Sequence, residues 1–213
     1  QPAFRIVRAQ EGGGDEEVVL LGIGGGEVRL GHHRHDLLGQ GFHAGAGNPV
    51  IGEGSHYAKI MFVGEAPGRN EAKTGRPFCG AAGKILDELL ASVGIDRKDV
   101  YITNIVKDRP PFNRDPLPEE IEIYGPFLDR QIEIIQPEVI ATLGRFSMDY
   151  IIKKFGLESQ LKSISQMHGK VFNAGASYGN IKIVPLYHPA VAIYNKTTKD
   201  ILIKDFQVLK DFK

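Results

Sequence analysis

The chain of 213 residues lacks several features that would place it in a specialised class. It has one cysteine, Cys79, and no tryptophan, which excludes an intramolecular disulfide framework. Lys plus Arg and Asp plus Glu are balanced at 26 each, so no overall field is directed at nucleic acid or membranes. No apolar run is long enough to span a bilayer. We expect a cytoplasmic monomer without a membrane partner.

Two phosphate-binding fingerprints are also missing. Neither GxGxxG nor GxxxxGK[ST] occurs in the sequence. The glycine-rich stretch that comes nearest, GEAPGRNEAKTGRPF, carries Glu65 and Glu71, whose charges would repel phosphate groups. An ordinary nucleotide-phosphate cradle is therefore not expected.

Glycine and histidine are concentrated at the beginning of the chain. The first 56 residues hold 14 of the 26 glycines and five of the seven histidines. Two β-rich runs flank the glycines at 24–26, a pattern typical of a hairpin. We expect residues 1–48 to form an irregular, glycine-rich segment that includes this hairpin and packs on a main domain of residues 49–213.

The main domain alternates apolar, β-rich runs with helical patterns. Four runs are nearly continuous, as in strands buried on both faces of a parallel sheet: AKIMFVG, VYITNIV, EVIATLG and IKIVPLY. Helical patterns follow, one opening near Gly80, one interrupted by Gly125-Pro126, one around Met148, and one closing the chain. The alternation predicts an α/β three-layer sandwich with a central, mainly parallel four-stranded sheet.

Four unusual segments follow the four runs: GEAPG, TNIVKDRPPFNRDP, LGRFS and YHPA. Ligands of open α/β sheets bind beyond the carboxyl ends of the strands. Each segment alone has an ordinary interpretation as a solvated turn or a structural histidine. Their convergence at one edge of the sheet predicts the functional site there.

The residue types in these segments favour a flat heterocycle attached to a polyanion. Phe78 offers an aromatic face, Asn104 an amide that can read a planar base, and His188 a donor at a strand end. A cationic rim suited to phosphates follows the amide: Lys107, Arg109 and Arg114. This combination indicates base extrusion, in which a flipped base is stacked and read along its polar edge.

The motifs GEAPG, GRPF, TNIVK with RPPFNRDP, and HPA, in this order and spacing, resemble those of the thermostable family 4 uracil-DNA glycosylases. The resemblance runs from about Gly52 to the C-terminus, roughly three-quarters of the chain. It implies the uracil-DNA glycosylase fold and a DNA repair enzyme that hydrolyses the N-glycosidic bond of uracil. The implied partner is uracil-containing DNA, single- or double-stranded.

Carried over position by position, the resemblance implies roles for the base-binding residues. Phe78 would stack on uracil, and Asn104 would read its Watson–Crick edge. His188 would donate to uracil O2 as negative charge develops there, a form of electrostatic catalysis.

The resemblance also implies residues for the water and for the DNA. Glu71, with the backbone at Glu65 and Ala66, would position the attacking water, so that Glu65 counts with Glu71 as catalytic and Ala66 also as uracil-binding. Contacts to phosphates and to the duplex fall on a larger set: Lys107, Arg109, Arg114, Gly144, Arg145, Ala190, Val191 and Ile193.

The sequence departs from the family pattern at the cofactor positions. Family members bind a four-iron, four-sulfur cluster through cysteines, which such clusters require. Asp108 and Tyr124 stand at two of those positions here. The other two fall upstream in one of two registers: Leu37 and Gln40, or His32 and His35. Cys79 is not a cluster position, so we expect no cluster. A further departure is Ala72, where relatives carry Asp.

Three alternatives remain open at this point. Zinc could use ligands of allowed types whose spacing matches no standard pattern: His32, His33, His35, His43 and Asp108. The chain could be a non-catalytic binder of uracil-containing or single-stranded DNA. It could also be a small-nucleotide hydrolase, which the proline-stiffened cationic loop disfavours.

Overall fold

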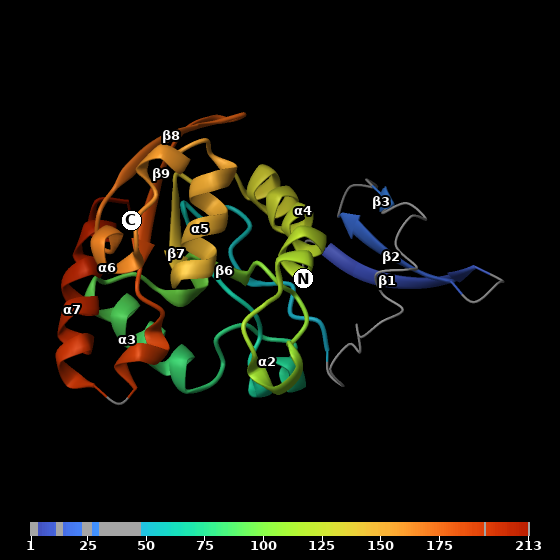
Figure 1. The fold of residues 1–213 in the computed structure, drawn as a ribbon, viewed down its shortest axis with the longest axis horizontal. Coiled ribbons are helices and arrows are strands. Elements are labelled where there is room, and N and C mark those ends of the chain that lie inside the picture. The colour runs from blue at the N-terminus through green and yellow to red at the C-terminus, as the bar shows by residue number, and fades with distance from the viewer. Residues whose placement is uncertain (1–3, 12–14, 23–26, 30–47, 194, 213) are drawn as a thin grey trace. The chain divides into compact units, whose positions relative to one another are not determined.

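The computed structural model describes residues 4–11, 15–22, 27–29, 48–193 and 195–212. The chain divides into two compact units, Gln1–Ala44 and Gly45–Lys213. Figure 1 labels the helices and strands. None of the helices in the described ranges has the length and apolar character needed to cross a membrane.

The N-terminal unit contains three antiparallel strands in the order β1-β2-β3. Strand β1 (Phe4–Glu11) pairs along its whole length with β2 (Asp15–Gly22), and β2 pairs with β3 (Glu27–Arg29). The hairpin expected around the glycines corresponds to β2 and β3, and residues 24–26 lie outside the described residues. Strand β1 was not expected, because polar side chains interrupt its apolar pattern. Packing of this segment on the main domain stays a prediction.

The main unit is built on a sheet in the order β4-β6-β5-β7-β9-β8. Its four central strands run parallel to one another: β6 (Tyr101–Asn104), β5 (Ile60–Gly64), β7 (Val139–Leu143) and β9 (Gly179–Leu186). These are the four predicted runs. Two antiparallel edge strands, β4 (Glu53–Gly54) and β8 (Phe172–Ala176), extend the sheet beyond the four strands predicted.

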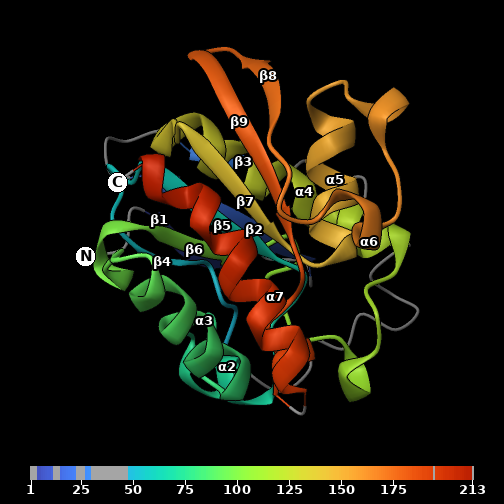
Figure 2. The same ribbon diagram turned by 90° about the vertical axis from the view of Figure 1, so that its left-hand side faces the viewer.

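Helices cover both faces of this sheet, as Figure 2 shows. One face carries α3 (Ala81–Ser92) and α7 (Lys196–Phe206), and the other carries α4 (Pro118–Ile135), α5 (Arg145–Lys154) and α6 (Ile164–Met167). Successive residues of a strand feed opposite cores, because side chains alternate across a sheet. Phe62 packs with α3 and α7, whereas Met61 packs with α4 and α5. The three-layer α/β sandwich is confirmed.

Helix α4 runs without a break through Gly125-Pro126, where the sequence predicted an interruption. The glycine serves packing against α5 instead. A Cβ on Gly125 would lie 2.4 Å from the Tyr150 hydroxyl, so the glycine lets Tyr150 approach and donate to Asp129 at 2.9 Å. Shorter helices fill the connections: α2 (Arg69–Thr74), η1 (Arg97–Asp99), η2 (Pro111–Asn113), η3 (Glu158–Gln160), η4 (Pro189–Ala192) and η5 (Gln207–Phe212).

Candidate active site

Asn104 and Gly64 are register partners at the carboxyl ends of β6 and β5. Because Gly64 has no side chain, Asn104 and Phe78 both approach it. A Cβ there would lie 2.3 Å from Asn104 Oδ1 and 2.8 Å from the Phe78 ring. Asn104 is 1% exposed, and its Nδ2 finds no hydrogen-bond partner among the described residues. A buried donor without a partner is costly to a fold, so this amide is available to an acceptor on a ligand.

The backbone of Phe78 is held in a left-handed conformation, with φ at 47°, which is rare for a bulky residue. Two contacts impose it. A Cβ on Gly83 of α3 would lie 1.7 Å from the Phe78 carbonyl oxygen, so only glycine fits there. The Glu71 carboxylate accepts backbone N–H groups from Gly68, Phe78 and Cys79. Burial raises the pKa of Glu71, and these donors oppose the rise. Glu71 therefore secures the turn that presents the Phe78 ring.

His188 follows β9 and contacts Phe78, with ring centroids 5.5 Å apart and planes tilted by 33°. Burial lowers the pKa of His188 to about 4, so the imidazole is neutral at neutral pH. The Ala190 backbone N–H donates to His188 Nδ1 at 3.2 Å. A neutral ring that accepts at Nδ1 carries its proton on Nε2. The free edge of His188 is therefore a neutral N–H donor.

Glu65 is the carboxylate that directly follows β5. Burial raises its pKa to about 6, the negative charge of Asp115 adds to the rise, and Arg145 opposes it. Within the described part of the chain, no hydrogen bond or ion pair engages this carboxylate. Glu65 thus differs from Glu71, whose carboxylate is occupied by backbone donors. Ala66, next to Glu65, is partly exposed.

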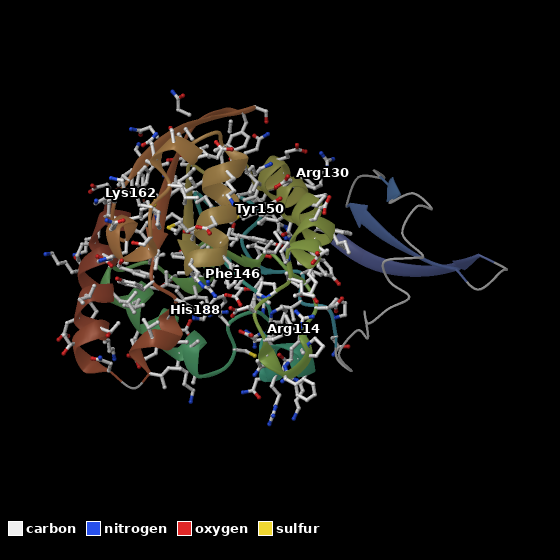
Figure 3. All side chains as sticks on the ribbon, in the orientation of Figure 1. Arg114, Arg130, Phe146, Tyr150, Lys162 and His188 are labelled. Atoms are coloured by element: carbon white, nitrogen blue, oxygen red, sulfur yellow. The ribbon has the colours of Figure 1, made fainter. Side chains whose placement is uncertain are left out.

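The N-terminus of α5 forms one side of the site. Arg145 is 61% exposed there, pairs with Asp115 at 2.5 Å and lies over the Phe146 ring at 4.2 Å. The Gly144 N–H donates to the Leu186 carbonyl at 2.9 Å, so this amide is engaged within the fold. In Figure 3, the labels of Phe146, His188 and Arg114 lie near one another, from the centre of the main unit downward.

The segment TNIVKDRPPFNRDP, which includes the end of β6 and the loop after it, contains two arginines that are already paired. Arg114 makes a two-pronged ion pair with the largely buried Glu120, each N–O distance being 2.7 Å. The Arg109 Nε donates to Asn113 Oδ1 at 2.6 Å. Both cations remain partly exposed at the surface of the loop. Their pairing fixes the loop and leaves their outer faces to solvent.

Lys107 does not belong to this rim, which corrects the sequence prediction. It is 1% exposed, and its Nζ donates to Asn104 O at 2.6 Å, Gln131 Oε1 at 2.7 Å and Thr103 Oγ1 at 2.8 Å. An ammonium with all three donors occupied inside the core does not reach a phosphate. Burial lowers the pKa of Lys107 to about 7. The residue instead ties the end of β6 to α4.

The segment after His188 forms η4. Val191 is 44% exposed, while Ala190 and Ile193 are partly exposed. Val191 is therefore the apolar side chain that η4 offers most openly. Among the predicted residues, the structure thus brings Phe78, Asn104 and His188 together, with Glu65 and Arg145 near Asp115.

The residues at the cofactor positions do not fit an iron–sulfur cluster. The Tyr124 hydroxyl donates to the Asp108 carboxylate, so these two positions form a hydrogen-bonded pair of oxygen ligands instead of thiolates. The upstream candidates lie outside the described residues: His32, His33, His35, Leu37, Gln40 and His43. In the described ranges, no group of three or more His, Cys, Asp or Glu residues could hold a metal ion.

Sequence reasoning missed the buried polar network behind Asn104. Gln131 Nε2 donates to the Ile51 carbonyl at 2.9 Å, and Thr103 donates to the same oxygen at 2.6 Å. A signal was present, because Gln131 interrupts the apolar stripe of α4. A polar residue at a core position is expected to have a buried partner.

Comparisons with known proteins identify the family. A sequence model described as the Uracil DNA glycosylase superfamily matches residues 51–210. A Type-4 uracil-DNA glycosylase of Sulfurisphaera tokodaii is 49% identical over 165 residues, covering 77% of this chain and 74% of the relative. One from Archaeoglobus fulgidus is 49% identical over 160 residues, covering 75% and 79%. One from Thermotoga maritima is 42% identical over 172 residues, covering 80% and 85%.

Proposed function

Because the chain belongs to the uracil-DNA glycosylase superfamily, we propose that it removes uracil from DNA by hydrolysing the N-glycosidic bond, leaving an abasic site. The observation that carries this proposal is the unpartnered amide of Asn104 beside the Phe78 ring. Such an arrangement suits a planar base that has left the DNA stack.

Base recognition is assigned to Phe78 and Asn104. The ring supplies a stacking surface. The Asn104 Nδ2 donates to uracil O4, and Oδ1 accepts from uracil N3–H. Cytosine carries an amino donor where uracil has O4, so it would set two donors against each other and leave the buried amide unpaired. Recognition by a buried polar group therefore favours uracil strongly over cytosine.

Leaving-group stabilisation is assigned to His188. As the bond between N1 and C1′ breaks, its electron pair leaves with the base, and negative charge reaches uracil O2. The neutral Nε2–H donates to this oxygen. Loss of one preorganised donor of this kind costs about 3 kcal/mol, or roughly a hundredfold in rate. The role requires no titration of His188 near neutral pH, which agrees with its lowered pKa.

Water activation is assigned to Glu65, with the Ala66 backbone beside it. The unengaged Glu65 carboxylate can accept a proton from water as the oxygen bonds to C1′. Glu71 is assigned a positioning role, because its oxygens already hold the turn at Phe78. We also propose that the reaction needs no iron–sulfur cluster, because Asp108 and Tyr124 offer no thiolate.

DNA contacts are assigned to the exposed edge of the site. The free N–H groups at the start of α5, beyond Gly144, with Arg145, suit a phosphate, since a helix N-terminus attracts anions. The outer faces of Arg109 and Arg114 suit neighbouring phosphates. Val191, with Ala190 beside it, is the candidate wedge that enters the duplex where uracil leaves. We propose that the protein acts on such DNA as a cytoplasmic monomer.

The test is an end-labelled oligonucleotide with one uracil, incubated with the protein and then cleaved at abasic sites with alkali. Wild type should produce the cleaved fragment, and Asn104→Ala should produce none while remaining folded by circular dichroism. Asn173→Ala, on exposed strand β8, is the matched control and should retain activity. A stable complex without any abasic product would favour the alternative of a non-catalytic binder.

A further inference from the structure

The loop that follows β6 carries an exposed aromatic side chain that base recognition does not use. Phe112 is 99% exposed, although exposing a phenyl ring to water forgoes the benefit of burying it. Its backbone has φ at 57°, and the next residue, Asn113, has φ at 54°. Left-handed conformations are unfavourable for residues with a side chain, most of all for a bulky one. The exposed ring and the left-handed backbone are both unfavourable, and the loop has both.

The loop around Phe112 is held in place by covalent and polar restraints. Pro110 and Pro111 fix the backbone before it. After it, Asn113 accepts a hydrogen bond from Arg109 at 2.6 Å, and Arg114 is clamped by Glu120. The outward position of the Phe112 ring is thus a property of an anchored loop.

This ring lies on the same side of the sheet as the proposed active site. The loop starts directly after Asn104, and its Asp115 reaches the N-terminus of α5 through the ion pair with Arg145. The other nearly fully exposed aromatic side chain in the described ranges, Tyr57 at 95%, lies between β4 and the start of β5. Tyr57 is therefore at the amino end of the parallel strands, opposite the site.

We propose that Phe112 is a DNA-contacting residue that stacks on an unpaired base of the substrate strand near the flipped uracil. This proposal rests on the proposed function and extends it to the neighbouring nucleotides. Cations flank the ring on both sides in sequence, Arg109 and Arg114. Proteins that bind single-stranded nucleic acid combine aromatic side chains with cations. Every base has a face that can stack on the ring, and a phosphate beside it that can pair with a cation.

The proposal has a consequence for the preference between single-stranded and double-stranded DNA. Stacking on a base requires that the base be unpaired or easily unstacked, which single strands and weakened duplexes provide. Phe112 should therefore contribute more to single-stranded substrates than to fully paired ones. The side chain acts in binding and takes no part in bond cleavage.

The test compares Phe112→Ala with Tyr57→Ala on one single-stranded oligonucleotide with a single uracil. Under single turnover, Phe112→Ala should raise the protein concentration for half-maximal rate by about fivefold to a hundredfold, the range of one base–aromatic stack. The rate at saturation should stay near that of wild type. Phe112→Trp should restore half-saturation, and Tyr57→Ala should match wild type.

Fluorescence anisotropy of the same labelled oligonucleotide separates this proposal from the proposed function. If no variant cleaves but Phe112→Ala still binds more weakly than Tyr57→Ala, the stacking role stands and catalysis fails. If Phe112→Ala cleaves and binds like wild type, the stacking role is refuted and the proposed function stands. A lower rate at saturation with unchanged binding would also refute it.

Discussion

Replacing Glu65 by Gln should remove the acid limb of the pH–rate profile. The pKa of Glu65 is raised to about 6 by burial and by Asp115, so its carboxylate is ionised above that pH and protonated below it. If ionised Glu65 activates the water, the single-turnover rate falls as pH falls. Between about pH 7 and about pH 5 the ionised fraction drops about tenfold, and the rate should drop with it.

His188 does not produce a limb in the same window. Its pKa is lowered to about 4, so it is mostly neutral at both ends of the measurement. Glu65→Gln should therefore be slower than wild type and nearly independent of pH. Glu71→Gln is the matched control, because this carboxylate is partly buried in the same loop but holds the backbone of Phe78. Its rate should fall at every pH while the tenfold dependence remains.

The assay is excision of uracil from an end-labelled oligonucleotide with the protein in saturating excess, so that binding does not contribute. A flat wild-type profile would contradict the assignment of Glu65. Retention of the acid limb in Glu65→Gln would contradict it equally, because the titrating group would then lie elsewhere.

Further predictions concern Gly64 and Lys107. Gly64→Ala should slow excision at least about tenfold without unfolding, because its Cβ would displace Asn104 and Phe78, and loss of well-placed catalytic groups has effects of this size. Gly175→Ala, where a Cβ meets nothing within 4 Å, is its control, and equal rates for the two would refute the packing argument. For Lys107, the pKa is lowered to about 7 in the folded chain from an ordinary 10.5, so the unfolded chain binds more protons between these values. The free energy of unfolding should rise with pH across that range in wild type and lose this rise in Lys107→Met, measured by urea titration at about pH 7 and about pH 9. Equal slopes for both proteins would show that Lys107 is not buried as described.

The sequence was sufficient for the centre of the fold because its strands are continuous apolar runs. Strands β5, β6, β7 and β9 are buried on both faces, and such runs are hard to mistake. The edge strands were missed because β4 has only two residues and β8 reads FNAGA, with small side chains that carry little pattern. The break predicted at Gly125-Pro126 was wrong, because α4 continues through both residues, and Gly125 serves instead to leave room for the Tyr150 ring.

At the site, the sequence predicted those residues whose types are chemically distinctive at the ends of strands. Phe78, Asn104 and His188 were found in this way. In the structure, Phe78 contacts His188 and approaches Gly64 together with Asn104. Lys107 shows where local reasoning stops. A lysine in a basic loop is normally solvated, and one of the three acceptors that stabilise its burial, Gln131, is distant in sequence. The exposure of Phe112 could not be predicted from the sequence either, because it depends on how the loop is anchored.

The rigid setting of Phe78 bears on how the protein searches for its target. An enzyme that removes a rare base meets undamaged bases in nearly every encounter. Because Glu71 and Gly83 fix the Phe78 backbone before any base arrives, no rearrangement is needed to test one. A base that does not match the Asn104 amide is rejected by a surface already in its final shape. Each inspection can then be brief, and time on DNA is concentrated where uracil is present.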